Sequence, residues 1–152
     1  MRIKILTAGA LLALVLLLAG CAGGTSTGTE SKSGNSTITD GVMTTSVDEG
    51  SKPTGGIVTS FPVSSPIIYC SFKVNGVAKD DMIKATWVYV GNSSGQVNNE
   101  INETYDIVQA PEASYYLAFY LDKPAEGWSK GDYKVVLSIN NKEKLSVPFK
   151  ME

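Results

Sequence analysis

The sequence predicts an all-β fold of about seven antiparallel strands in a two-sheet sandwich, and three observations lead to this prediction. Residues 57–152 hold all 13 aromatic side chains of the 152-residue chain. Within this region apolar and polar residues alternate with a period of two, which is typical of half-buried strands. Turn residues interrupt the alternation at short intervals, and no segment keeps the 3.6-residue apolar period of a helix.

Each strand is expected where the alternation runs without a turn residue. In chain order the expected strands are 57–61, 67–74, 83–89, a weak or edge strand within 99–109, 115–121, 133–139 and 145–151. Pro62 ends the first strand because proline cannot donate to a ladder. Asn140-Asn141 separates the last two strands, since asparagine tolerates positive φ. The inward-facing residues supply about 25 apolar side chains, enough for one core at this size.

The N-terminus has the features of an export signal. Arg2 and Lys4 precede an apolar segment over 5–18, and small residues follow. A helix needs about 20 apolar residues to cross a bilayer core, so this segment is too short for a membrane span. A positive start, a short apolar stretch and small residues predict a signal peptide over residues 1–20.

Leu18, Ala19 and Gly20 stand directly before Cys21. This motif resembles the lipobox of bacterial lipoproteins. The resemblance implies that signal peptidase recognises Leu18-Ala19-Gly20, that Cys21 receives a diacylglycerol, and that Cys21 becomes the mature N-terminus. Each buried CH₂ of an acyl chain contributes about 0.8 kcal/mol to membrane binding. The expected location is therefore the extracytoplasmic side of a bacterial membrane; the alternative is an ordinary cleaved signal that happens to be followed by a cysteine.

Residues 21–56 are expected to form a flexible, lipid-anchored tether. Of the 35 residues 22–56, 22 are glycine, serine or threonine, and none is aromatic. Such a segment buries too little apolar surface to offset the entropy of ordering its backbone. Within it, only the weak patch over 42–47 could pair as a strand. The folded domain is accordingly placed at 57–152.

The domain resembles an immunoglobulin-like or fibronectin-III-like domain of bacterial surface proteins. The resemblance rests on Cys70 in the second strand, Trp87 in the third and Tyr133 in the sixth, with Gly127-Trp128 leading into it. It implies that Cys70 and Trp87 lie in the core and that Tyr133 is a tyrosine-corner residue. Val135 stands where antibody domains have their second cysteine, so the inter-sheet disulfide of those domains is not expected.

Composition excludes several classes of function. The chain has no histidine, two cysteines, and 13 basic against 15 acidic residues, for a formal net charge of −2. Histidine-dependent catalysis and zinc fingers are thereby excluded, and nucleic-acid binding is not expected. Asp80-Asp81 suits a solvated charged turn better than a calcium loop. We predict no enzymatic activity, no cofactor and no metal.

The candidate binding surface is aromatic. Tyr116 and Tyr120 project from one face of their strand, about 13–14 Å apart at the rise of a β-strand. Tyr69 projects similarly from its own strand, and Trp128 lies in a connection where it is either an exposed anchor or a plug at the end of the sandwich. Exposed aromatic residues stack on sugars or anchor protein partners. The alternative is ordinary cross-strand packing.

These features predict a lipid-anchored, extracytoplasmic interaction module that displays one immunoglobulin-like domain. Its partners would be the membrane, through lipid on Cys21, and a protein or polysaccharide of the envelope. Two alternatives remain open. One is a carbohydrate-binding module that uses the exposed tyrosine and tryptophan rings; the other is a structural spacer without a ligand.

Overall fold

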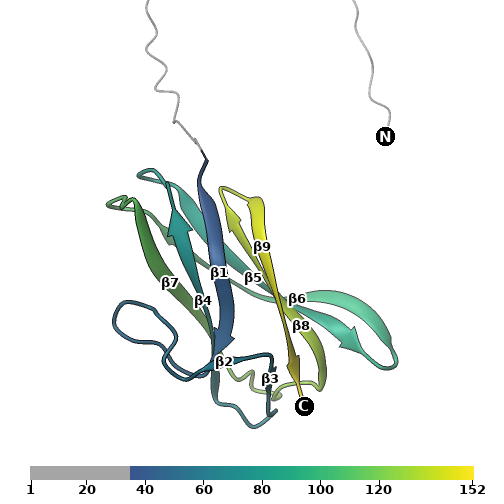
Figure 1. The fold of residues 1–152 in the computed structure, drawn as a ribbon. Coiled ribbons are helices and arrows are strands. Elements are labelled where there is room, and N and C mark those ends of the chain that lie inside the picture. The colour runs from purple at the N-terminus through teal and green to yellow at the C-terminus, as the bar shows by residue number, and fades with distance from the viewer. Residues whose placement is uncertain (1–34) are drawn as a thin grey trace, which may run out of the picture. The chain divides into compact units, whose positions relative to one another are not determined.

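A computed structural model describes residues 35–152, which form nine β-strands in two sheets and no helix (Figure 1). The strands are β1 (Thr37–Thr44), β2 (Ile57–Val58), β3 (Ser60–Phe61), β4 (Ile67–Asn75), β5 (Met82–Asn92), β6 (Gly95–Ile107), β7 (Ser114–Asp122), β8 (Gly131–Ile139) and β9 (Lys142–Met151). Two of these strands are only two residues long, so seven strands build the body of the sandwich. The predicted all-β sandwich is confirmed.

The first sheet has the strand order β2-β1-β4-β7, and the second has the order β3-β9-β8-β5-β6. All neighbouring strands are antiparallel except β3 and β9, which are parallel. The single strand expected over 57–61 is divided at Thr59, so that β2 pairs with β1 and β3 pairs with β9. The chain therefore changes sheets within a few residues at this point.

The predicted tether is wrong over residues 37–56, because β1 lies inside the first sheet between β2 and β4. Ile38 and Met43 are both buried in the core. Their spacing of five does not fit strict alternation, but a register shift between Thr39 and Val42 turns both side chains inward. Asp40 within this bulge has a φ of 54°. The segment is rich in glycine, serine and threonine, and the bulge interrupts its alternation. For these two reasons the sequence did not indicate a strand here.

Gly41 allows β1 to approach the second sheet closely. A Cβ atom at this position would lie 2.5 Å from Cδ2 of Leu145 and 2.8 Å from Cγ2 of Val147, both on β9. Only glycine fits such a contact without displacing its neighbours. The close approach of β1 to β9 helps to close the core between the two sheets.

The core forms where the inward faces of the two sheets meet. The buried apolar residues include Ile68, Cys70, Phe72, Val74, Ile83, Ala85, Trp87, Tyr133, Val135, Leu137, Ile139, Val147, Phe149 and Met151. This set confirms the alternation predicted for β4, β5, β8 and β9. The inward residues of β7 are less enclosed, since Tyr115, Leu117 and Leu121 are only partly buried.

The three predicted core residues Cys70, Trp87 and Tyr133 are all buried. Tyr133 Oη donates a hydrogen bond to the carbonyl of Ser129 at 2.8 Å, four residues upstream, which is the geometry of a tyrosine corner. Trp87 Nε1 lies 3.3 Å from Thr104 Oγ1, so the buried indole has a hydrogen-bond partner. These contacts confirm the roles that the resemblance implied for the three residues.

Strand β6 lies at the edge of the second sheet, as predicted for the polar segment over 99–109, but begins earlier at Gly95. Two irregularities interrupt its register with β5, one between Trp87 and Val88 and the other between Tyr89 and Gly91. In Figure 1 the hairpin of β5 and β6 reaches outward from the rest of the sandwich. Most of β6 is exposed.

The burial of β1 predicts that Met43→Ala destabilises the domain by about 2–5 kcal/mol, because it leaves a cavity in a closed core. The measurement is urea unfolding, followed by tryptophan fluorescence, of a soluble form comprising residues 22–152. The control is Thr39→Ala on the same strand, which is exposed and should change the free energy of unfolding by less than about 0.5 kcal/mol. Equal stability of the two variants would show that β1 is dispensable.

Candidate functional site

The tyrosines of the predicted binding surface come from neighbouring strands of the first sheet. Tyr69 on β4 lies directly opposite Tyr120 on β7, and Tyr116 lies opposite Lys73. The rings of Tyr69 and Tyr120 are 6.0 Å apart at an interplanar angle of 50°. Tyr120 is 53% exposed, whereas Tyr69 and Tyr116 are half-buried. The exposed part of the predicted surface is therefore the Tyr69–Tyr120 pair.

Tyr116 is separated from this pair by the segment between β1 and β2, residues 45–56. Ser71 lies on the same face of β4 as Tyr69, and its Oγ donates to the Ser51 carbonyl at 2.6 Å. Lys52 Nζ lies 5.6 Å from the centroid of the Tyr116 ring, within range of a cation–π contact. The segment thus covers part of the outer face of the first sheet and leaves the Tyr69–Tyr120 end accessible.

Trp128 does not belong to the exposed surface, so its assignment as a binding residue is corrected. Its side chain is only 7% exposed, and its Nε1 donates to the Ser65 carbonyl at 2.8 Å. The ring packs edge-on against Tyr133 with 6.3 Å between centroids. Gly127, at a φ of 81°, makes the turn that directs the indole inward. Trp128 therefore plugs the end of the sandwich, which is the alternative that the sequence predicts for it.

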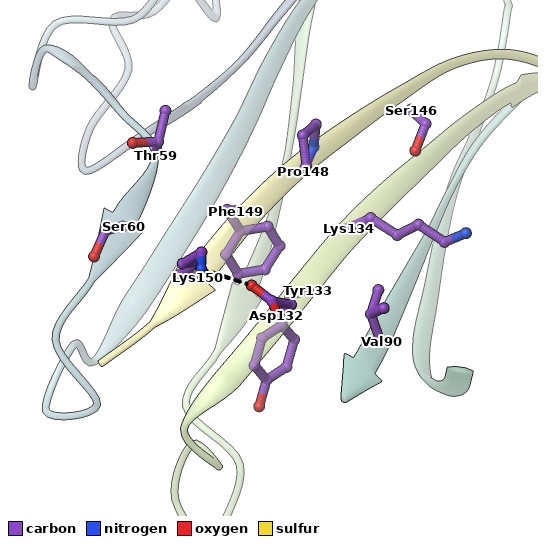
Figure 2. Close-up of a pocket in the computed structure, with 10 residues that line it drawn as sticks. All are labelled: Thr59, Ser60, Val90, Asp132, Tyr133, Lys134, Ser146, Pro148, Phe149 and Lys150. Atoms are coloured by element: carbon purple, nitrogen blue, oxygen red, sulfur yellow. Dashed lines mark ion pairs between the residues drawn. The ribbon is translucent and has the colours of Figure 1, made fainter. Parts of the chain in front are cut away.

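A second surface feature, which the sequence analysis missed, is an open groove of about 670 Å³ on the second sheet (Figure 2). Its lining includes Ser60 of β3, Val90 of β5, Lys134 of β8 and Pro148 of β9. Lys150 and Asp132 form an ion pair of 3.1 Å within it. Pro148 and Lys134 lie opposite each other in the β8–β9 register.

The one sequence signal for this groove was Pro148 in the middle of a predicted strand. Proline is found on strands whose N–H side is not paired. Strand β9 is paired along its length with β8, but with β3 only at Lys150 and Met151. The uncovered length of β9 accommodates the proline. A proline within a strand indicates that one side of the strand is unpaired. It does not indicate that a ligand binds there.

Asp81 is buried rather than solvated, which corrects the charged-turn interpretation of Asp80-Asp81. Its Oδ2 accepts from the backbone N–H of Ala78 at 2.8 Å, and its Oδ1 accepts from Asn140 Nδ2 at 2.7 Å. The carboxylate therefore ties the turn before β5 to the turn between β8 and β9. Among residues 35–152, no group of three or more metal-ligating side chains gathers at one place.

Glu103 on β6 pairs with Lys84 on β5. Lys84 Nζ donates to Glu103 Oε1 at 2.7 Å, and Thr86 Oγ1 donates to the same oxygen at 3.2 Å. The hydrogen bond from Lys84 is the main cause that lowers the pKa of the Glu103 carboxyl. The Glu103 carboxylate is therefore kept ionised, and its negative charge is balanced by the neighbouring Lys84 ammonium. This arrangement suits a surface ion pair better than a general acid.

The predicted signal peptide and lipobox, including Leu18, Ala19, Gly20 and Cys21, lie outside the described residues. The same holds for residues 21–34 of the predicted tether. Within residues 35–152, no helix is long and apolar enough to span a bilayer.

The strand order defines the class of protein. In the usual lettering of immunoglobulin domains, β1, β4 and β7 correspond to strands A, B and E, and β9, β8, β5 and β6 correspond to G, F, C and C′. With Trp87 buried on strand C and the tyrosine corner on strand F, the described residues form an immunoglobulin-like β-sandwich.

Comparison with known proteins adds two solved structures of similar architecture. An immunoglobulin-like protein from Pseudomonas aeruginosa is 13% identical, with a TM-score of 0.47 over 78% of this chain and 98% of its own. Alkylpurine DNA glycosylase AlkC from Pseudomonas fluorescens, bound to DNA containing an abasic site analog, is also 13% identical with a TM-score of 0.47. That match covers 77% of this chain and only 30% of the glycosylase. No family of known sequences and no curated protein matches the chain.

Cys70 is predicted to be chemically inert in the folded domain. Burial raises the pKa of its thiol to about 12, so the reactive thiolate is essentially absent near neutral pH. In the 22–152 form, where Cys70 is the sole cysteine, a thiol reagent at pH 8 should label it only as fast as the domain unfolds. Labelling should become rapid in denaturing urea. Rapid labelling of the native protein would contradict the buried position.

Proposed function

We propose that this chain is a lipid-anchored, extracytoplasmic interaction module. The observation that carries the proposal is the sequence Leu18-Ala19-Gly20-Cys21 after a short apolar segment, which resembles a lipobox. Lipid on Cys21 would fix the location, and residues 22–34 would connect it to the immunoglobulin-like domain. The domain supports the proposal because its core is closed and its outward surfaces remain for a partner.

The partner would be a protein or a polysaccharide of the cell envelope. A sandwich of this size offers sheet faces, edges and loops for contact, and the described residues show no cluster of metal ligands. We therefore propose binding and display rather than catalysis. The lack of histidine in the chain supports this choice.

The anchoring proposal is tested by Cys21→Ser in the full chain, expressed in a bacterium supplied with labelled palmitate. We expect the unchanged chain to incorporate label and to partition into the detergent phase. Cys21→Ser should do neither, because serine has no thiol to form the thioether. The matched control is Cys70→Ser, which removes the other cysteine and should keep the label. Label that persists in Cys21→Ser would exclude Cys21 as the acceptor.

A second candidate function is carbohydrate binding by the Tyr69–Tyr120 pair. Two adjacent aromatic rings, one of them half exposed, form a surface on which a sugar ring can stack. The row of three rings considered in the sequence analysis is not available, because Trp128 is buried. A sugar would therefore contact only one end of the first sheet.

The carbohydrate hypothesis predicts that Tyr120→Ala weakens binding of the 22–152 form to envelope polysaccharide about tenfold, equivalent to about 1.4 kcal/mol. The affinity is measured by calorimetry against a panel of purified polysaccharides. Ile57→Ala is the control, because Ile57 is a large side chain of the same sheet that is even more exposed than Tyr120, at 67% against 53%. If the folded domain binds none of the panel, or Tyr120→Ala binds unchanged, this function is excluded.

A further inference from the structure

Strand β7 is an uncovered edge of the first sheet. The strand order of this sheet is β2-β1-β4-β7, so β7 pairs with β4 on one side and with no described strand on the other. In immunoglobulin domains of the constant type the corresponding order is A-B-E-D, and strand D covers strand E. Residues 108–113, which join β6 to β7, form no strand in the place of D. Since β7 corresponds to E, the described residues lack the strand that would cover it.

The backbone of β7 offers hydrogen-bonding groups along this edge. Its nine residues pair with β4 in one unbroken register. Lys123, directly after the strand, donates its N–H to the carbonyl of Pro66, directly before β4. In an antiparallel ladder the N–H and C=O of one residue point to the same side, and the side alternates along the strand. The odd-numbered residues of β7 therefore pair with β4, whereas Tyr116, Ala118 and Tyr120 direct their N–H and C=O groups to the free edge.

Strand β7 lacks the features that ordinarily protect an edge strand from pairing. Natural edge strands carry lysine, proline or a bulge. The sequence of β7, Ser-Tyr-Tyr-Leu-Ala-Phe-Tyr-Leu-Asp, contains neither lysine nor proline, and its register with β4 has no bulge. By contrast, two irregularities interrupt the register of β6, the long edge of the second sheet. A regular, apolar edge such as β7 is the kind to which an extended segment adds as a further strand.

A hollow of about 390 Å³ lies at this edge, between β7 and β6. Residues 118–122 of β7 line one side of it, and Asn102 and Thr104 of β6 line the other. Asn102 and Thr104 lie opposite Trp87 and Ala85, which are buried in the core, so they face the interior of the sandwich. The hollow is therefore space between the two sheets. The inward-facing side chains of a strand added to β7 would enter it.

The charged side chains at the hollow are acidic. Asp122 lines it, and no lysine or arginine does; Lys123 is the next residue in the chain but is not part of the lining. Burial is the main cause that raises the pKa of the Tyr115 hydroxyl, and the charges of Asp106 and Glu112 raise it further, so both carboxylates lie near the start of β7. None of these three carboxylates forms an ion pair with a described residue. Both ends of the edge therefore favour a basic partner.

The surroundings of the edge favour an extended segment over a folded second copy. Two copies joined through β7 would place the β7 of each copy in the hollow of the other, under its β6. The β6 of each copy would then have to lie over the β7 of the other, where that copy's own second sheet already packs. Residues 22–34 of the same chain are glycine, serine, threonine, alanine, one glutamate and one lysine, so they offer no large apolar side chain for the hollow. The occupant is therefore a segment of another protein.

We propose that β7 binds an extended segment of a partner protein as an additional antiparallel strand, in the place of strand D. Apolar side chains at every second position of the segment pack in the hollow against Phe119 and Leu121. Lysine or arginine near its ends faces Asp122 and Asp106. The proposal rests on the interaction function proposed above and specifies its partner: backbone hydrogen bonds give affinity, and the alternate side chains give specificity. Because strand addition needs no lipid on Cys21, its test and the palmitate test fail independently.

Amide hydrogen exchange of the 22–152 form, measured by NMR, tests the proposal. The probe is a synthetic peptide of the length of β7, in which valine and threonine alternate between two terminal lysines. We expect saturating peptide to slow exchange at Tyr116, Ala118 and Tyr120 at least about tenfold, because their N–H groups become hydrogen-bonded. Exchange at Leu117 and Phe119, whose N–H groups already pair with β4, should stay unchanged.

Three outcomes overturn the proposal. Absence of peptide binding up to about 1 mM would show that the edge does not accept a strand. Binding without protection of the even-numbered residues would place the peptide elsewhere on the domain. Protection that appears without peptide and rises with protein concentration would show that a second copy occupies the edge.

Asn102→Lys tests the role of the hollow. A lysine at this position narrows the hollow and repels the lysines of the peptide, so the affinity should fall at least about tenfold. Asn99→Lys is the matched control, because it adds the same charge to the same strand but lines a different hollow. Its affinity should stay within about twofold of the unchanged domain. Equal effects of the two lysines overturn the proposal.

Methylation of the peptide tests the backbone pairing on the unchanged domain. Two peptides carry N-methyl groups on alternate residues, one on the odd set and the other on the even set. Only one set of N–H groups can face β7, so one peptide should lose binding and the other should keep it. Equal loss, or equal retention, in the two peptides overturns strand addition.

Discussion

The packing of aromatic rings around Phe149 is the contact on which the sandwich depends. Phe149 on β9 stacks on Tyr133 at 5.2 Å and meets Phe61 and Trp87 edge-on at 6.0 and 6.4 Å. These residues come from four strands of the second sheet, including the short β3. The division of the chain at Thr59 lets β3 pair with β9, which brings Phe61 next to Phe149. Each aromatic pair of this kind stabilises the fold by about 0.5–1.5 kcal/mol, in addition to the stabilisation that comes from burying its apolar surface.

Where alternation is regular, the sequence was sufficient to predict the structure. In β4 and β8 the residues expected to face inward are buried, and Tyr133 forms the expected corner. Strand β1 was not predicted because its alternation is irregular. Its two buried anchors are separated by a bulge, and Gly41 contributes to the fold by having no side chain. A search for apolar residues at every second position does not detect a strand that contains a bulge. Composition alone does not distinguish Gly41 from a glycine in a linker.

The candidate surfaces were less predictable, because exposure depends on loops rather than on strands. Alternation correctly placed Tyr69 and Tyr120 on one face of the first sheet. It could not show that the segment over 45–56 folds onto the same face beside Tyr116. Nor could it show that Gly127 turns Trp128 into the core. The groove beside Pro148 is lined by residues from four strands. The pattern of residues along the sequence does not indicate that these strands lie next to one another.

The geometry of the sandwich keeps its outward surfaces independent of one another. The Tyr69–Tyr120 pair lies on the outer face of the first sheet, whereas β6 is an edge of the second. A molecule bound on the outer face of the first sheet would therefore leave β6 uncovered, and a molecule bound along β6 would leave the Tyr69–Tyr120 pair uncovered.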